Sequence, residues 1–258
     1  MILRKHADFC RFLFQNFMIE LVDSIEELVS YSKRDLFSVR VLSLANAYGF
    51  VYPFAKFYRQ VDDDMTVTAI VSVLDGDTVI SHLSDFDNTE LSQFFSFCAF
   101  STLLADESFA FKGNYSSGAV MANDKKFELE CDYSDINDYP SLSELYNFVD
   151  YGGIDFNAWY VDISHRIRHG SAKAAAIVNE NGEIISSAVF SSVYNGDAVL
   201  TAVRTDPQMR GKGCAGALVS SMCCSVSGTV FLMREADKNE SFYSKLGFKN
   251  VGNWRMYK

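Results

Sequence analysis

A strand, a glycine-bearing loop and a helix follow one another near the C-terminus, and this order constrains the possible fold most. Residues 198–203 read as a strand, residues 204–215 contain the loop, and helical sequence continues to about residue 224. Glycine adopts backbone conformations that are closed to other residues, so Gly211 and Gly213 allow several N–H groups to converge at the start of the helix. Such an arrangement is suited to binding a phosphate group.

Arg210 and Lys212 add two positive charges to this loop, in a chain whose net charge is -10. Cations beside converging N–H groups favour a diphosphate. The spacing does not fit two other phosphate loops, because a dinucleotide loop has three glycines in a different rhythm and a nucleoside-triphosphate loop ends in Gly-Lys-Ser or Gly-Lys-Thr. A strand-to-helix turn that needs glycine only for steric reasons stays open as an alternative.

Two motifs resemble those of the GNAT N-acetyltransferases. Residues 208–213, Gln-Met-Arg-Gly-Lys-Gly, resemble the family's pyrophosphate signature Gln/Arg-x-x-Gly-x-Gly/Ala, and Val203 and Pro207 before them are similar too. Residues 242–248, Phe-Tyr-Ser-Lys-Leu-Gly-Phe, resemble the family's Phe-Tyr-x-Lys-Leu-Gly-Phe segment. The resemblance covers residues 129–258 and implies an α+β GNAT fold, with a central, mostly antiparallel twisted sheet flanked by helices.

The same resemblance implies acetyl-CoA as co-substrate, without a metal. Tyr243 would be the general acid that protonates the CoA thiolate, because a phenol with an ordinary pKa near 10 stays protonated at neutral pH. The family often has an asparagine seven residues before this tyrosine, a position that Ala236 occupies in this chain. The asparagine of this chain, Asn239, lies closer to Tyr243 in sequence. The residues implied to contact CoA are Ala202, Val203, Gln208, Met209, Arg210, Gly211, Lys212, Gly213, Cys214, Ala215, Asn239 and Phe242.

The sequence says less about the general base and about the residues that would bind the amine acceptor. No acidic residue occurs in residues 198–203, where many GNAT enzymes have a glutamate that acts through water. Glu235, Asp237 and Asp155 are open alternatives for the general base. An amine would approach over residues 151–159, so the candidate substrate-binding residues are Tyr151, Asp155 and Trp159, with core packing as the alternative role of Trp159.

Residues 127–258 are predicted to form the acetyltransferase domain. Two Asn-Gly pairs, at 181–182 and 195–196, lie between apolar runs and predict hairpins with positive φ at both turn residues. The expected strands are 127–131, 174–178, 184–193, 198–203 and 229–233, and the expected helices before the glycine loop are 141–149 and 157–168.

Residues 1–126 are predicted to form a smaller N-terminal α+β domain. It has no glycine loop, so we expect no CoA binding there even if it is a degenerate GNAT-like half. Residues 112–126 are rich in turn formers, which predicts the domain boundary. Residues 1–17 are either an extension or part of a first helix. The expected helices are one that ends near residue 33, 36–47 and 90–105, and the expected strands are 66–73 and 78–83, joined through Asp75-Gly76.

Composition narrows the possible partners. Six cysteines without repeated spacing indicate reduced thiols in the cytoplasm rather than disulfides or a zinc site. The negative net charge argues against a nucleic-acid partner, because phosphate binding needs a basic stripe. The longest apolar stretch, residues 94–104, is too short to cross a membrane.

Three functional hypotheses follow from these patterns. The leading one is transfer of an acetyl group to a small-molecule or protein amine by direct attack in a ternary complex, with the N-terminal domain covering the acceptor side or mediating homodimer formation. The alternative is a non-catalytic acyl-CoA-binding sensor, which the missing general base keeps open. An aminoacyl transferase built from two related domains is disfavoured by the acidic balance of the chain.

Overall fold

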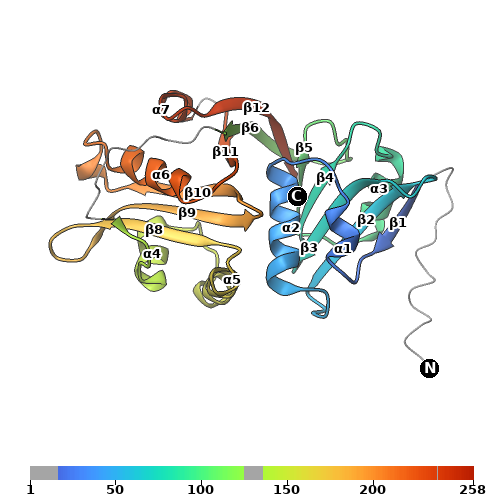
Figure 1. Cartoon of the computed structure of the whole chain (residues 1–258), viewed down its shortest axis with the longest axis horizontal. Coiled ribbons are helices and arrows are strands. Elements are labelled where there is room, and N and C mark those ends of the chain that lie inside the picture. Colours follow the sequence, from blue (N-terminus) through green and yellow to red (C-terminus); the bar gives the residue numbers. More distant parts are fainter. Residues whose placement is uncertain (1–16, 125–135, 237) are drawn as a thin grey trace. The chain divides into compact units, whose positions relative to one another are not determined.

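Figure 1 shows the computed structural model of the chain, which describes residues 17–124, 136–236 and 238–258. The chain divides into two compact units, unit 1 with Met1–Gly118 and Gly252–Lys258, and unit 2 with Ala119–Val251. The fold is mixed α+β, with helices flanking the strands of a large sheet, as predicted. The expected boundary between residues 126 and 127, the strand at 127–131 and the structure of residues 1–16 lie outside the described residues.

Unit 1 has helices between its first two strands and one helix between its fourth and fifth strands. Strands β4 and β5 are parallel, and the other neighbours with a described register are antiparallel. The strand order is β1 (Phe17–Leu21), β2 (Ala55–Asp62), β3 (Val67–Leu74), β4 (Asp77–His82), β5 (Thr102–Asp106) and β12 (Lys249–Tyr257). Its helices are α1 (Glu26–Val29), α2 (Leu36–Tyr48) and α3 (Asn88–Phe97).

Unit 2 has the same arrangement, with β10 and β11 as its parallel pair. Its strand order is β7 (Ile136–Asn137), β8 (Lys173–Val178), β9 (Ile184–Tyr194), β10 (Asp197–Thr205), β11 (Val230–Glu235) and β6 (Tyr115–Asn123). Its helical elements are α4 (Leu142–Val149), α5 (Phe156–Arg168), η2 (Pro207–Met209), α6 (Cys214–Cys224) and α7 (Glu240–Lys245). Figure 1 shows α4 and α5 on one side of these strands and α6 on the other.

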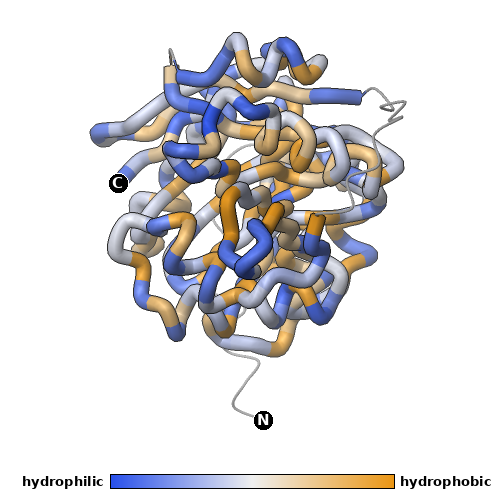
Figure 2. Tube along the Cα trace, turned by 90° about the vertical axis from the view of Figure 1, so that its left-hand side faces the viewer, coloured by the Kyte–Doolittle hydropathy of each residue, from blue (hydrophilic) through white to orange (hydrophobic). Residues whose placement is uncertain are grey.

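Alternating side chains of the unit 2 strands build the two layers of its core, because successive residues of a strand point to opposite faces. Ala175 and Phe190 pack with α6, whereas Ala174 and Val189 pack with α4 and α5. Figure 2 shows that the hydrophobic stretches of the chain lie mainly in the interior of the trace and the hydrophilic ones on its outer loops.

The two units repeat one another in detail. Residues 73–80, Val-Leu-Asp-Gly-Asp-Thr-Val-Ile, and residues 193–200, Val-Tyr-Asn-Gly-Asp-Ala-Val-Leu, form matching hairpins with positive φ at both turn residues. In unit 1 the N–H of Ser101 donates to the carbonyl of Gly76, and in unit 2 the N–H of Gly228 donates to that of Gly196, each at 2.8 Å. The registers of the parallel pairs also match, since Thr78 lies opposite Leu103 and Ala198 opposite Val230.

Each unit contains a strand from the other half of the chain. The end of β6, which follows β5 in sequence, belongs to unit 2, where β6 is the neighbour of β11. The end of β12, which follows α7 in sequence, belongs to unit 1 and pairs with β5, Trp254 opposite Asp106 and Tyr257 opposite Leu103.

Several sequence predictions are confirmed. Helices α2, α4, α5 and α6 lie within one or two residues of their expected ranges, and so do the strands β3, β4, β8, β9, β10 and β11. Gly49 ends α2 with a φ of 62°, and Ser141 caps α4 by accepting a hydrogen bond from the N–H of Glu144. These ends were predictable because caps and turns depend on local sequence.

Four predictions about local structure in unit 1 are wrong. The first helix is only α1, and residues 17–21, where no strand was predicted, form β1, which pairs with the unexpected strand β2. The expected helix 90–105 ends at Phe97, and its second half is β5. A parallel strand buried on both faces is a continuous apolar run, which periodicity cannot distinguish from a buried helix. The turn-rich segment 112–126 contains strand β6.

One hairpin prediction in unit 2 is also wrong in its detail. Gly182 has a φ of 83°, but Asn181 does not share its positive φ. The side chain of Asn179 closes this turn instead, because its Oδ1 accepts from the N–H groups of Asn181 and Glu183 at 3.0 and 2.9 Å. The β8–β9 connection is therefore an asparagine-capped loop.

Among the described residues, no helix has the length and apolar content required to span a membrane. Within the same ranges, no group of three or more His, Cys, Asp or Glu side chains is placed to hold a metal ion.

Candidate functional site

The end of strand β10 departs from regular pairing. Its pairing with β11 covers only Ala198–Leu200, and its register with β9 is interrupted between Thr201 and Arg204. Ala202 at this interruption has a φ of 52°, a conformation that costs a residue with a side chain of order 1–3 kcal/mol. The hydroxyl of Ser187 donates to the carbonyl of Ala202 at 3.0 Å and holds it there. Ala202 and Val203 thus lie where β10 leaves its regular pairing with β9.

The loop after β10 leads into an uncapped helix. Gly211 and Gly213 have φ values of 77° and 87°, which favour glycine, and Gly213 is the N-cap residue of α6. Gly213 makes no side-chain cap hydrogen bond to the first turn of α6, whose N–H groups have no partner within the helix. A Cβ built on either glycine meets nothing within 4 Å, so open space lies in front of the loop.

The matching helix of unit 1 lacks this property. Asp87 is the N-cap residue of α3, and its Oδ1 accepts from the N–H groups of Thr89 and Glu90 at 2.8 and 3.0 Å. A carboxylate therefore already occupies the place that an anionic ligand would take at this helix. Of these two helices, only α6 presents its N-terminus to a ligand.

Two guanidinium groups face the same region without an ion-pair partner in residues 17–124, 136–236 and 238–258. Arg210 Nε donates to the carbonyl of Thr205 at 3.3 Å, which folds this side chain back toward β10. Arg204 Nη1 donates to the carbonyl of Val149 at 2.6 Å, and its guanidinium lies 5.8 Å from the ring centre of Phe148. In a chain with a net charge of -10, unpaired cations here favour an anionic ligand.

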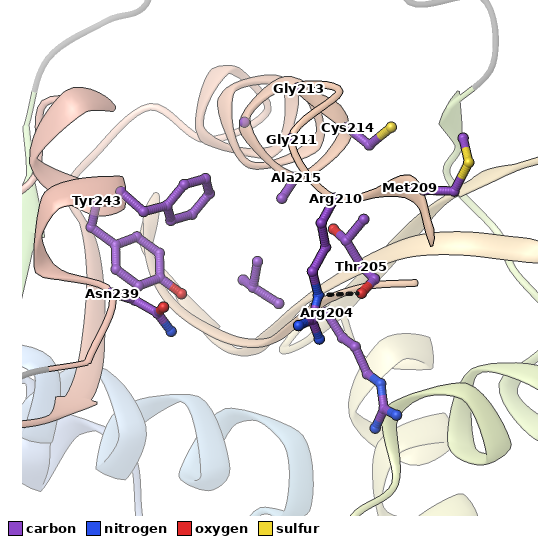
Figure 3. A pocket seen from close by; sticks show the side chains of 13 residues that line it. Arg204, Thr205, Met209, Arg210, Gly211, Gly213, Cys214, Ala215, Asn239 and Tyr243 are labelled. Carbon is purple, nitrogen blue, oxygen red and sulfur yellow. Dashed lines mark hydrogen bonds between the residues drawn. The ribbon is translucent and has the colours of Figure 1, made fainter. Parts of the chain in front are cut away.

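These elements enclose a cavity of about 570 Å³ in unit 2. Figure 3 shows it between Tyr243 and Asn239 of the α7 segment on one side and Arg204 and Arg210 on the other, with the glycine loop and α6 above. The lining residues are Val203, Arg204, Thr205, Met209, Arg210, Gly211, Gly213, Cys214, Ala215, Gly216, Asn239, Phe242 and Tyr243.

Ten of the residues expected to bind or transform a CoA ester line this cavity: Val203, Met209, Arg210, Gly211, Gly213, Cys214, Ala215, Asn239, Phe242 and Tyr243. Ala202, Gln208 and Lys212 are their chain neighbours and are not in its lining. The lining residues Arg204, Thr205 and Gly216 are additions to the sequence-based set. They flank the loop motif directly, and that adjacency was the only available signal.

Tyr243 projects from α7 into the cavity (Figure 3). Its ring packs between Phe242 and Phe248, with ring centres 5.0 and 5.7 Å away. Burial raises its pKa above the ordinary value, so the phenol stays protonated at neutral pH. Its hydroxyl makes no hydrogen bond to another described residue, which leaves it available to a ligand.

The start of α7 is fixed by an ion pair that the sequence did not indicate. Arg234, buried at the end of β11, contacts Glu240 at 2.6 Å between Nη2 and Oε2. At the other end of the helix, Nδ2 of Asn123 donates to the carbonyl of Leu246 at 2.8 Å. The position of Tyr243 therefore depends on β11 and β6 as well as on its own helix.

The expected acceptor residues lie outside the cavity lining. Tyr151 and Trp159 pack against each other with ring centres 4.9 Å apart, and burial raises the pKa of Tyr151 to about 12. Trp159 is half-buried against the Leu145 and Ile163 core of α4 and α5. Asp155 caps α5 by accepting from the N–H of Ala158 at 2.9 Å. Tyr151, Asp155 and Trp159 come shortly after Val149 in the sequence. The carbonyl of Val149 accepts a hydrogen bond from Arg204, a lining residue of the cavity.

The carboxylates considered as general bases have other contacts. Glu235 pairs with Lys238, Asp155 caps α5, and Asp237 lies outside the described residues. No carboxylate or imidazole occurs among the described residues that line the cavity.

Comparison with known proteins concerns the fold of the chain. No protein-family profile matches the sequence, and no curated protein matches it. A solved Drosophila protein structure covers 93% of this chain and 98% of its own, with 13% identity and a TM-score of 0.64. A GNAT-family acetyltransferase from Colwellia psychrerythraea gives 13% identity, the same coverage of both chains and a TM-score of 0.52.

A tandem GNAT protein from the clavulanic acid biosynthesis pathway matches 93% of this chain and 97% of its own, with 10% identity and a TM-score of 0.56. At such low identity these likenesses concern the fold alone. The chain has the fold of the GNAT acetyltransferases, and the fold prediction made from its two motifs is confirmed.

Proposed function

We propose that this chain is an acetyl-CoA-dependent N-acetyltransferase that acts on a primary amine. The observation that carries the proposal is the uncapped start of α6 behind Gly211 and Gly213, which faces the same cavity as the unpaired guanidinium of Arg210 and the hydroxyl of Tyr243. The fold shared with GNAT acetyltransferases supports the same reaction class.

The binding half of the proposal follows from the donor set. The diphosphate of CoA would accept hydrogen bonds from the N–H groups at Gly211–Ala215 and pair with Arg210. The pantetheine arm would run along Ala202 and Val203, where the regular pairing of β10 with β9 is interrupted. Backbone N–H groups there are suitable donors for the oxyanion that develops on the thioester carbonyl.

In the reaction, the neutral amine attacks the thioester carbonyl carbon, a C–N bond forms, and the C–S bond breaks. The nitrogen loses one proton to solvent, and the departing thiolate receives one from the Tyr243 hydroxyl, which solvent then reprotonates. The acceptor would enter from the side of α4 and α5, where Arg204 contacts Val149. Tyr151, Asp155 and Trp159 remain candidates for contacts further out.

The proposal is tested by thiol release from acetyl-CoA across a panel of primary amines, together with calorimetric titration of CoA. We expect CoA binding and turnover with at least one amine class. Failure of CoA to bind at millimolar concentration would contradict the proposal.

An acyl-CoA sensor is the second candidate function. It is favoured by one observation, the lack of a carboxylate or imidazole among the described lining residues, which leaves the amine without an evident proton acceptor. CoA binding without thiol release from any amine in the panel would support the sensor and reject the enzyme.

A further inference from the structure

The repeated units differ at the end of α3, where unit 1 has a second cavity of about 400 Å³. Its floor is a row of three residues across the sheet, since Lys56 pairs with Val73 and Val73 with Thr78. The next row, Tyr58, Val71 and Ile80, packs in the core that contains α3. Residues two apart in a strand share a face, so the floor lies on the α3 side of the sheet.

Helix α3 ends before it covers this last row. Phe95 and Cys98, at the end of α3, line the cavity, and the backbone becomes extended at Cys98. The N–H of Ser101 donates to the carbonyl of Gly76 at 2.8 Å, which fixes the following loop to the β3–β4 turn. The complete lining is Pro53, Phe54, Lys56, Tyr58, Val73, Asp75, Gly76, Thr78, Phe95, Cys98 and Ala99.

A buried hydroxyl without a partner lies in the floor of this cavity. Thr78 is 1% exposed, and its Oγ1 has no hydrogen-bond partner among the described residues. An unpaired buried hydroxyl is unfavourable, and a ligand that hydrogen-bonds it removes that cost. Thr78 alternates with Val79 and shares its face with Ile80, which packs in the α3 core, so its side chain faces the cavity.

Unit 2 has different residues at the matching positions. Ala198 stands where unit 1 has Thr78, two residues after the turn glycine in both units. Val226 stands where unit 1 has Ala99, four residues before the residue paired across the parallel strands. Val226 packs against the core of unit 2. Compared with unit 2, unit 1 thus has a smaller side chain at the cavity, Ala99 in place of valine, and an added hydroxyl, Thr78 in place of alanine.

The charges at the cavity favour an uncharged ligand. Lys56 and Asp75 contribute one charge of each sign to the lining, and the remaining walls are mainly aromatic and aliphatic. A charged group placed at Thr78 would lose its hydration for a single hydroxyl partner, which is unfavourable. A neutral ring system with one hydrogen-bonding group satisfies both the apolar walls and Thr78.

We propose that this cavity is a binding site for a small, uncharged aromatic molecule that carries one hydrogen-bonding group directed at Thr78. The site is separate from the cavity at α6 and does not depend on acyl transfer. The probe is 2-naphthol, with naphthalene as the analogue without a hydroxyl and 2-naphthoate as the charged analogue.

The test uses the full chain, fluorescence titration, and the rate at which N-ethylmaleimide modifies Cys98 relative to the exposed Cys224, measured by peptide mass spectrometry. We expect 2-naphthol to bind below millimolar concentration, to protect Cys98 but not Cys224, and to bind about tenfold more tightly than naphthalene or 2-naphthoate. Absence of binding, or equal protection of both thiols, would overturn the proposal.

Two variants and a control separate binding from folding. Thr78→Val should abolish the preference for 2-naphthol over naphthalene without lowering the melting temperature, and Ala99→Trp should fill the cavity and abolish binding of both. Ser72→Ala is the matched control, because its hydroxyl is also buried without a partner but belongs to the alternate face of β3 and does not line the cavity. An unchanged preference in Thr78→Val, or its loss in Ser72→Ala, would contradict the assignment.

Discussion

Arg204 donates a hydrogen bond of 2.6 Å from Nη1 to the carbonyl oxygen of Val149, the last residue of α4. The donor comes from β10 beside the proposed CoA cavity, and the acceptor comes from the helix pair on the other side of the strands. This bond therefore connects the two sides from which the thioester and the amine would arrive.

We expect Arg204→Gln to loosen the segment after α4. Loss of one charge-assisted bond, made by an exposed side chain, should lower the free energy of unfolding by no more than about 1 kcal/mol. Amide hydrogen exchange should become faster at residues 149–155, and the KM for the amine should rise more than that for acetyl-CoA. Arg210→Gln is the control, and we expect it to raise the KM for acetyl-CoA without a change in exchange at residues 149–155.

Tyr243→Phe should lower kcat by a factor of about 10²–10⁴, the range typical of a lost general acid, while CoA binding changes little. The ring contacts with Phe242 and Phe248 remain, so the fold should be unaffected. Single-turnover kinetics and calorimetry measure the two effects separately. A variant as active as the parent would remove Tyr243 from the mechanism.

The alkaline stability of the protein should depend on Tyr243. Burial raises its pKa in the folded state above the ordinary value of 10.0, so the folded form holds the phenol proton more tightly than the unfolded form. The associated stability is complete below pH 10 and is lost as the pH rises through the folded-state pKa. Denaturation curves from pH 8 upward should therefore show a smaller alkaline loss in Tyr243→Phe than in the parent.

Gly213→Ala should weaken CoA binding at least tenfold. The residue has a φ of 87°, so alanine costs about 1–2 kcal/mol of stability, and its Cβ would project into the open space in front of the loop. Gly182→Ala is the matched control, with a φ of 83° and equally open surroundings in the β8–β9 connection. Calorimetry should show a similar stability loss in both variants and lost CoA affinity only in Gly213→Ala. Equal CoA affinity in both would contradict the diphosphate assignment.

Tyr257→Ala should destabilise unit 1 although the residue is next to the C-terminus. Tyr257 is fully buried, pairs with Leu103 of β5 and donates to the carbonyl of Phe109 at 2.9 Å. Removing such a ring costs about 3–5 kcal/mol. Urea unfolding should detect this loss, and Lys249→Ala, an exposed substitution in the same strand, should have no comparable effect.

The parts of the fold that follow from local chemistry were predictable from the sequence. Asn195-Gly196 and Asp75-Gly76 specify their turns, and Gly211 with Gly213 specify the loop before α6. The two eight-residue segments at 73–80 and 193–200 share the pattern Val-x-Asp/Asn-Gly-Asp-x-Val-Ile/Leu, and such an internal repeat indicates a duplicated arrangement from the amino-acid sequence alone.

Features that depend on distant partners were not predictable in the same way. Nothing local to Thr102–Asp106 distinguishes a buried strand from a helix, because its pairing with β4 and β12 decides the matter. The contacts of Arg204 with Val149 and of Arg234 with Glu240 join residues from separate elements. The glycine loop of the candidate site was therefore visible in the sequence, whereas the contact of Arg204 with Val149 was not.

The exchange of β6 and β12 between the units limits how this gene can be rearranged. A break after β6 would give an N-terminal product without β12 and a C-terminal product without β6, so neither of these two halves should persist as an independent gene without a compensating change. A chimaera that imports unit 2 from a relative replaces one continuous stretch of coding sequence, residues 119–251, whereas one that imports unit 1 would have to replace two separate stretches together, residues 1–118 and 252–258.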